Sequence, residues 1–420
     1  MLADYFVKPA TVDRIRANWL APQIELYVDW MRAHGYRDRS VHHRVPVVCA
    51  FAAFAQRHGA ADISSAPALI DQFAAHWLQD HGTGCTSDRA RRSVLKDASG
   101  PVRQMLELAL SGDITRHRAC KSFPFAAEAP GFIAYLRQER GLREATIVHY
   151  AHYLSAFGNY CRRVAANTLS AASPALLAAF VVDHCPRLSP SSRINLCGCL
   201  RVFLRYCHRE QLIESDLSAA VEMPQSYRLA AVPRAIGWDD VRRLLAAVDR
   251  RTGKGRRDYA ILLLLVTYGL RGYEVAHLRL DDIDWQREQL RIPDRKAGHC
   301  TAYPLAAVVG EAIIDYLKQG RPATEDRHLF FRSVAPRVPI TSAAISSAVS
   351  AYLQQADIRV HRGGSHTLRH TCVQRLIDAE FPLKTIGDYV GHRSPDSTAI
   401  YTKVALACLR EVAMGDGEAL

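Results

Sequence analysis

An internal repeat dominates the N-terminal half of this chain of 420 residues. Residues 27–77 align with residues 132–184 at a spacing of about 106 residues once single-residue gaps are allowed. Apolar residues recur at helical spacing in both copies, so each copy is expected to form a small bundle of amphipathic helices. Two alanine-rich bundles that share only composition are the alternative, but the aligned turn and core residues favour a duplication. The aligned pairs are Gly35 and Gly141, Phe51 and Phe157, Arg57 and Arg163, Pro67 and Pro174, and Phe73 and Phe180.

Two stretches without a helical period separate the expected modules. Residues 82–104 and 115–125 are rich in Arg, Lys, Ser and Gly, which predicts a linker or a DNA-facing connection between the copies. Residues 222–237 contain two prolines, which predicts a domain boundary after the second copy. Three domains are therefore expected. The first is a helical module at 1–110 that duplicates the second, which spans 126–222. The third spans 235–415.

The third module has a mixed pattern. The apolar run "YAILLLLVTYGL" at 259–270 is shorter than the ~20 residues that span a bilayer, so it predicts a buried core helix. Alternating runs at 282–293 and 300–305 predict a small antiparallel sheet. Helical periodicity returns from Leu305. The predicted fold class is mainly α with a small antiparallel β-sheet.

Charge and cysteine usage narrow the possible partners and the cell compartment. Lys and Arg number 54 against 42 Asp and Glu, and the net charge of +12 favours a polyanionic partner such as nucleic acid. Most of the positive charge is arginine, which suits bidentate phosphate contacts, although a GC-rich genome also favours arginine. The first residues form no signal-peptide core, and eleven cysteines lack C-x-x-C spacing. A cytoplasmic protein with reduced thiols and no membrane partner is expected.

Five short stretches of the third module are polar or basic where a core helix would be apolar. They are "YGLRGYE" (268–274), "DRKAG" (294–298), "SHTLRH" (365–370), "VGH" (390–392) and "STAIYTKV" (397–404). None is specific alone, but in this order and spacing they resemble the motifs of the tyrosine recombinase (phage integrase) family. The resemblance covers 235–405, and 126–222 resembles the family's SAM-like core-binding domain. Residues 1–110 are an extension that simpler members lack.

The resemblance implies a role for each matching residue. The expected catalytic residues are Arg271, Lys296, His366, Arg369, His392 and Tyr401, with Glu274 as a supporting residue. Arg295 competes with Lys296 for the place of the hairpin lysine. The interval from His392 to Tyr401 is typical of the family.

The chemistry explains why the family needs these residue types. Two arginines would neutralise the phosphate oxygens as charge builds in the transition state. A free phenol has a pKa of about 10, so His366 is the candidate that accepts the proton of Tyr401. Lys296 would protonate the departing 5′ oxygen, His392 would bind the same phosphate, and Glu274 would orient an arginine or histidine. The resulting 3′-phosphotyrosyl link conserves the bond energy, so neither a cofactor nor a metal is implied.

Three other functions share part of this residue pattern. A zinc hydrolase would use His366 and His370, but H-E-x-x-H requires Glu where Thr367 stands, so His370 is expected to be structural. A type IB topoisomerase-like enzyme and a catalytically silent DNA-binding accessory protein remain as alternatives.

The predicted function is a site-specific DNA recombinase or integrase of a mobile genetic element, acting in integration, excision or transposition. Its expected partners are double-stranded DNA, further copies of itself in a tetramer, and other recombinases of the same element, at the bacterial nucleoid. Residues 402–420 have an apolar face that would dock on a neighbouring protomer or fold back on its own domain.

Overall fold

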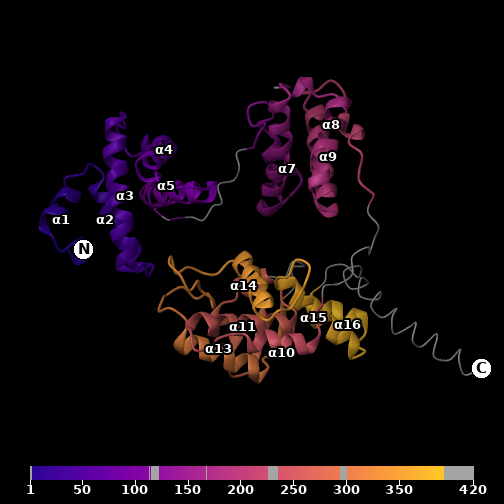
Figure 1. Ribbon diagram of the computed structural model, residues 1–420. Coiled ribbons are helices and arrows are strands. Elements are labelled where there is room, and N and C mark those ends of the chain that lie inside the picture. The colour runs from indigo at the N-terminus through magenta and orange to yellow at the C-terminus, as the bar shows by residue number, and fades with distance from the viewer. Residues whose placement is uncertain are drawn as a thin grey trace, which may run out of the picture. The chain divides into compact units, whose positions relative to one another are not determined.

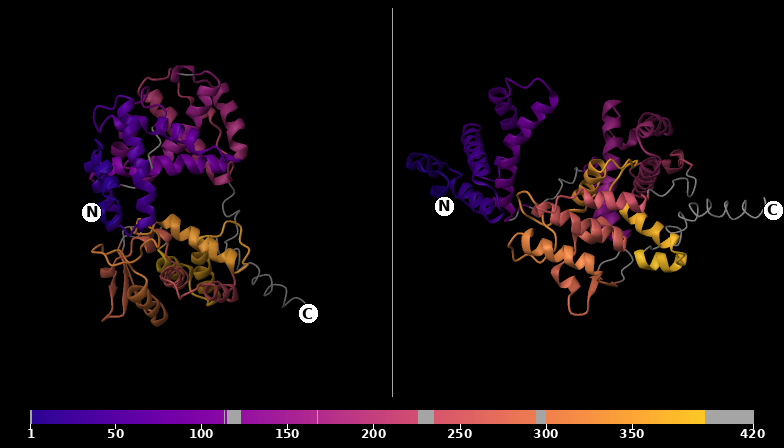
Figure 2. Two further views of the ribbon diagram at one scale, coloured as in Figure 1. Left: turned by 60° about the vertical axis from the view of Figure 1, so that its left-hand side comes forward. Right: turned by 60° about the horizontal axis from the view of Figure 1, so that its bottom comes forward.

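Three groups of helices, each with a hydrophobic core of its own, make up the described chain (Figure 1). The computed structural model describes residues 2–112, 114, 123–166, 168–225, 235–293 and 300–391. Within these residues the secondary structure is helical apart from one three-stranded sheet, as two further views also show (Figure 2). The predicted fold class is confirmed. No helix in the described ranges is long and apolar enough to cross a membrane.

The first group surrounds a core of fully buried aromatic side chains that includes Tyr27, Phe51 and Phe73. Its elements are η1 (Leu2–Asp4), α1 (Pro9–Arg16), α2 (Ala21–Ala33), α3 (Asp38–Arg57), η2 (Ala66–Leu69), α4 (Ile70–His81) and α5 (Asp88–Ser111).

Helix α5 corrects the prediction of a linker at 82–104. The Ser87 hydroxyl caps its start by accepting a hydrogen bond from the Ala90 N–H at 3.2 Å, and Gly112 ends it at a φ of 75°. Its buried residues begin only at Ala98, after a basic stretch. That stretch dominates the local composition and conceals the helical period of the residues behind it.

The second group contains the second copy of the repeat. Its core includes the fully buried rings of Phe132, Phe157, Phe180 and Phe203. Cys197 is buried within α9, as expected for a thiol in an apolar helical pattern. The elements are α6 (Phe132–Ala134), a π-helical turn η3 (Tyr135–Glu139), α7 (Glu144–Arg163), η4 (Leu169–Ala171), α8 (Pro174–His184), η5 (Cys185–Arg187), α9 (Pro190–Arg209) and η6 (Leu217–Ala220).

The third group is built around α11, whose residues from Ala260 to Val266 are all buried. This confirms the predicted core helix. The sheet is antiparallel in the order β1, β2, β3, with Leu290 paired to Tyr303, which confirms the predicted sheet. The elements are α10 (Trp238–Ala246), α11 (Gly253–Tyr268), α12 (Gly272–Ala276), η7 (Leu280–Asp282), β1 (Ile283–Asp284), β2 (Gln289–Ile292), β3 (Thr301–Pro304), α13 (Ala307–Gln319), α14 (Ser342–Gln355), α15 (Ser365–Asp378) and α16 (Leu383–Val390).

A buried charge network fixes the first turn of α11. Asp258 is 1% exposed and accepts hydrogen bonds from Arg257 Nη2 at 2.6 Å, from Lys254 Nζ at 2.8 Å and from the Tyr352 hydroxyl at 3.0 Å. Arg257 also donates to the Phe331 carbonyl at 2.9 Å. Buried charges are tolerated only when they are paired in this way. The network therefore ties α11 to α14 and holds the helix that leads to Arg271.

Candidate active site

Arg271 stands at the junction between α11 and α12. Helix α11 ends at Gly269 with a φ of 60°, and Arg271 is the N-cap residue of α12 with extended backbone. Glu274 holds Arg271 twice: its Oε2 accepts the Arg271 backbone N–H at 2.8 Å and its Oε1 accepts Arg271 Nη1 at 2.7 Å. The Glu274 side chain is 2% exposed and that of Arg271 is 22% exposed. The carboxylate thus fixes a guanidinium that still reaches solvent.

The start of α15 lies against the start of α12. A Cβ added to Gly272 would lie 3.0 Å from Ser365 Oγ, and one added to Gly364 would lie 2.5 Å from Ser346 Oγ. Only glycine permits such close approach without a shift of the neighbouring side chain. This packing brings the "YGLRGYE" and "SHTLRH" stretches together, as the site prediction requires.

Arg369 points from α15 into the domain. It is 4% exposed, and its guanidinium donates to the carbonyl of Gly269 and, at 2.7 Å, to the carbonyl of Val390. Arg271 Nη2 donates to the next carbonyl along, that of Gly391, also at 2.7 Å. Both arginines therefore meet at the C-terminal end of α16.

The helix end explains why two cations gather there. The last carbonyls of an α-helix have no partner within the helix and carry the negative end of its dipole, which favours arginine. Gly391 itself has a φ of 66° and turns the chain away from α16. The two arginines are thereby placed beside the residue that precedes His392.

His366 is the exposed residue in the first turn of α15, three residues before Arg369 and on the same face of the helix. The surrounding protein removes part of the hydration of the ring, and the charges of Arg369 and then Arg271 add to this, so the pKa of His366 is lowered. The imidazole is consequently neutral at pH 7 and has a lone pair to accept a proton. The His370 ring lies 6.5 Å from it, centre to centre. The described ranges contain no cluster of three or more His, Cys, Asp or Glu side chains that could hold a metal ion.

Comparison with known proteins identifies the family. Residues 235–407 match the phage integrase family, and residues 130–216 match the phage integrase N-terminal SAM-like domain. The integrase/recombinase y4rA of Sinorhizobium fredii is 32% identical over 393 residues, which are 92% of each chain. The chain belongs to the phage integrase family of tyrosine recombinases.

Two solved structures share the fold of this recombinase. XerH bound to a palindromic difH substrate in a post-cleavage complex covers 82% of this chain and 94% of its own, with a TM-score of 0.55 and 18% identity. A lambda integrase dimer bound to a core site covers 66% and 94%, with a TM-score of 0.52 and 18% identity. The chain is a tyrosine-type site-specific DNA recombinase, and none of these comparisons favours a topoisomerase-like enzyme or a silent accessory protein.

Three predicted residues of the recombinase lie outside the described residues: Lys296, His392 and Tyr401. The same holds for Arg295 and for the segment 402–420. Arg271, Glu274, His366 and Arg369 are described, and the contacts above bring them together.

Sequence analysis missed three tyrosines that join the motifs of the recombinase. The Tyr268 hydroxyl donates to the Pro304 carbonyl at 3.0 Å and accepts from the Ala306 N–H at 2.9 Å. The Tyr303 ring lies 5.1 Å from that of Tyr268 and 5.0 Å from that of Tyr389.

Hydroxyl bonds complete this contact between α11, β3 and α16. Tyr303 donates to the Tyr389 carbonyl, and Tyr389 donates to the Thr267 carbonyl at 3.1 Å. Tyr268 lies inside the first motif and Tyr389 directly precedes the glycine-histidine motif, which was the available signal for these two; Tyr303 lies five residues beyond 294–298 and had none.

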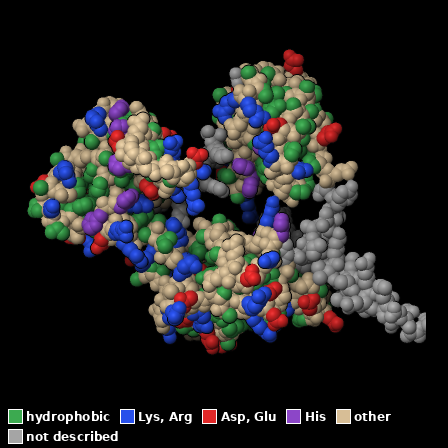
Figure 3. All heavy atoms as spheres, in the orientation of Figure 1, with side chains coloured by type: hydrophobic (Ala, Val, Ile, Leu, Met, Phe, Trp, Pro, Cys, Tyr) green, Lys and Arg blue, Asp and Glu red, His purple; other side chains and the backbone are tan. Residues whose placement is uncertain are grey.

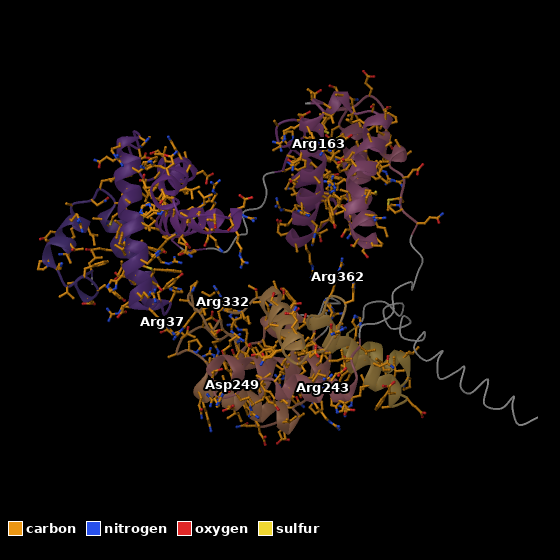
Figure 4. The ribbon with its side chains drawn as sticks, viewed as in Figure 1. Arg37, Arg163, Arg243, Asp249, Arg332 and Arg362 are labelled. Atoms are coloured by element: carbon orange, nitrogen blue, oxygen red, sulfur yellow. The ribbon has the colours of Figure 1, made fainter. Side chains whose placement is uncertain are left out.

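Positive charge also precedes α15. Arg359 and Arg362 are exposed in the loop that leads into this helix, and Figure 4 labels Arg362. Exposed arginines suit contacts with DNA phosphates.

Proposed function

We propose that this recombinase cleaves and rejoins DNA through a 3′-phosphotyrosyl intermediate on Tyr401, with Arg271 and Arg369 as the clamp on the reacting phosphate. The observation that supports this most is the convergence of both arginines on the consecutive carbonyls of Val390 and Gly391. Sites that stabilise a transition state need donors fixed before the reaction begins. The side chain of Arg271 is held in this way and is still 22% exposed, so it can reach a phosphate.

The proposed chemistry is a transesterification. The phenolate oxygen of Tyr401 attacks phosphorus, and the bond from phosphorus to the 5′ oxygen breaks. At neutral pH only about one free phenol in a thousand is ionised, so His366 accepts the phenolic proton. Lys296 gives a proton to the departing 5′ oxygen, with Arg295 as the competing donor. His392 donates to the same phosphate, and Glu274 positions Arg271.

Rejoining runs along the same path in reverse. A 5′ hydroxyl from another strand attacks the phosphotyrosine and returns the tyrosine to its free form. Cleavage and rejoining in this scheme use only groups of the protein and of the DNA.

We also propose how the modules of the recombinase work together. Residues 126–222 and 235–415 grip double-stranded DNA, and residues 1–110 form a further module. XerH and lambda integrase were each solved with DNA, and lambda integrase as a dimer. This recombinase would assemble into a tetramer on DNA, because strand exchange between two duplexes needs four active sites. Other recombinases of the same element would be further partners.

The biological setting proposed here is the bacterial nucleoid and a mobile genetic element. DNA affinity is then expected to fall steeply with salt, because much of it comes from phosphate contacts and counterion release.

The test is a covalent adduct between the full-length protein and DNA. A duplex from the ends of the protein's own element, nicked near the cleavage site, traps the intermediate because the released fragment diffuses away. Tyr401→Phe should abolish the denaturation-resistant adduct, and a metal chelator should leave it intact. Tyr273→Phe is the matched control, because Tyr273 is 56% exposed and lies two residues from Arg271. An adduct that survives in Tyr401→Phe, or one that a metal chelator removes, would refute the assignment.

A further inference from the structure

The two longest matching helices of the repeat bury the same positions. Helices α3 and α7 each have 20 residues. Every buried residue of α7 matches a buried residue of α3. The pairs are Val41 and Ile147, Val45 and Ala151, Val48 and Leu154, Phe51 and Phe157, Ala52 and Gly158, and Ala55 and Cys161.

The next helix packs on this face in the same way in both copies. The Phe51 and Phe73 rings meet edge to face with centres 5.3 Å apart, and the Phe157 and Phe180 rings do so at 5.1 Å. Edge-to-face pairs need a specific helix-to-helix geometry. Helices α4 and α8 therefore occupy the same place in the two bundles.

The correspondence extends to α5 and α9, beyond the part that sequence alignment covers. Each begins at a serine N-cap, Ser87 and Ser189, whose hydroxyl accepts the backbone N–H three residues later. Their buried faces also match. The pairs are Ala98 and Leu200, Pro101 and Phe203, Val102 and Leu204, and Met105 and Cys207.

The first helix of each copy shows how one inserted residue is absorbed. Tyr27 matches Phe132, and both are buried. Gly35 and Gly141 then end the helices at φ values of 70° and 58°. The second copy has one more residue between these points, and it contains the π-helical turn η3. A single π turn is the usual way for a helix to accommodate one extra residue.

We infer that residues 2–112 are a second DNA-binding module, duplicated from the SAM-like module at 130–216, and that it holds the phosphate backbone through the start of α5. This inference rests on the DNA-joining function proposed above. The contact surface is the basic segment of α5, which comprises Arg89, Arg91, Arg92 and Lys96.

The cations of the basic segment lie at the surface of their module, although Leu95 in the same segment packs partly buried against the core. No residue of α5 before Ala98 is buried, and all four cations are exposed. No ion pair joins any of the four to another described residue. Other arginines of the module are neutralised: Arg16 by Glu25 at 3.1 Å, Arg32 by Asp4 at 2.9 Å and Arg103 by Asp71 at 2.6 Å.

Exposed cations that form no ion pair repel one another and favour a polyanion that releases counterions when bound. Arginine is also the residue best suited to bidentate phosphate contacts.

Some basic positions recur in both copies. Arg37 precedes α3 and Arg143 precedes α7, while Arg91 and Arg193 lie equally far from their serine caps (Figure 4 labels Arg37). Lys and Arg side chains appear on the visible face of each helical group (Figure 3). A copy of a DNA-binding fold that keeps cations at matching places is suited to the same ligand.

The test compares two triple variants of the full-length protein. Arg89→Gln, Arg91→Gln and Arg92→Gln remove unpaired cations. The control, made of Arg16→Gln, Arg32→Gln and Arg103→Gln, removes the same charge from ion-paired sites of the same module. Affinity for a duplex from the ends of the element is measured at several salt concentrations. Each phosphate contact contributes ~0.9 to the slope of log affinity against log salt. The first triple should lower the slope by about 2 to 3, and the control by less than 1.

Equal slopes for the two triples would overturn the inference. So would a first triple that keeps the wild-type slope but no longer self-associates without DNA, because the basic segment would then bind an acidic protein surface. Failure of the proposed function is distinguishable, since it appears as a missing Tyr401 adduct in the wild-type protein itself. Thermal unfolding of both triples shows that each remains folded.

Discussion

Glu274 gives the sharpest test of how the site is built, because one carboxylate holds both the main chain and the side chain of Arg271. Its substitution should disorder the guanidinium without removing it. Glu274→Ala loses both hydrogen bonds and the charge. Glu274→Gln keeps one acceptor oxygen and therefore one of the two hydrogen bonds, but it loses the other bond and the charge, so it should fall between the wild type and Glu274→Ala.

The expected loss of stability follows from the burial of the pair. Removing one partner of a buried ion pair typically costs ~3 to 5 kcal/mol. Arg271 is 22% exposed and keeps its bond to the Gly391 carbonyl, so Glu274→Ala should cost about 2 kcal/mol, below that range. Loss of a donor to the transition state lowers a rate by ~10²- to 10³-fold, which is the upper limit for a misplaced Arg271. We expect cleavage to slow about 10- to 100-fold in Glu274→Ala and under about tenfold in Glu274→Gln.

The assay is single-turnover formation of the covalent adduct at saturating protein, beside thermal unfolding. The matched control is Asp282→Asn, because Asp282 caps Arg279 in the same way, with its Oδ2 accepting the Arg279 N–H at 2.8 Å, at η7. It should lower stability but leave the cleavage rate unchanged. If Glu274→Ala cleaves as fast as Asp282→Asn, Glu274 is only a helix cap and the positioning argument is wrong.

Three further predictions concern the same frame. Neutral His366 is the proposed active form and its pKa is lowered, so the cleavage rate should stay constant as pH falls to about 6.5 and decrease only below that pH. Arg271→Ala removes a positive charge near the ring, which should raise the pKa of His366 and shift the decrease to higher pH in a pH–rate profile. Tyr389→Phe loses a hydroxyl bond to the end of α11, worth about 1 kcal/mol, and should slow cleavage several-fold with DNA affinity unchanged in a binding titration. Gly269→Ala should lower the free energy of unfolding in urea by about 2 to 4 kcal/mol, because a Cβ there would lie 2.9 Å from an α16 side chain. In the control Gly59→Ala, the backbone is also left-handed but no atom obstructs the Cβ, so the loss should be only about 1 to 2 kcal/mol.

Sequence predicts those parts of the fold that are determined by residues close together in the chain. The run ending at Tyr268 is buried because nearly every residue in it is apolar, and the β2 and β3 strands alternate in the expected way. The four described residues of the proposed site were predicted from motif spacing. Spacing identifies residues, however, and does not tell what each side chain contacts.

The contacts of the site depend on packing between distant segments. That Arg271 and Arg369 would meet at the end of α16 follows from the close approach of Gly272 to Ser365, which no single stretch of sequence contains. The links among Tyr268, Tyr303 and Tyr389 arise in the same way. Helix α5 was missed for the opposite reason, because a local basic composition concealed its later helical period.

The repeat contains both features that the sequence predicts and features that only the structure shows. Its glycines and phenylalanines were visible in the sequence because turn and core positions tolerate few residue types. The match of α5 with α9 was not visible, since Met105 corresponds to Cys207 and Ala98 to Leu200. Such pairs share burial and not identity, so only the structure reveals them.

The arrangement around α16 would couple the proposed phosphate clamp to the segment that carries Tyr401, the proposed nucleophile. Glu274 fixes Arg271 alone, whereas the last carbonyls of α16 hold both arginines. A displacement of α16 would therefore release Arg271 and Arg369 together, and the same displacement would move the chain that continues to His392. If Arg271 and Arg369 hold the reacting phosphate as proposed, cleavage would require α16 to be in place. A Tyr401 brought in without α16 would then meet a site that cannot stabilise its transition state.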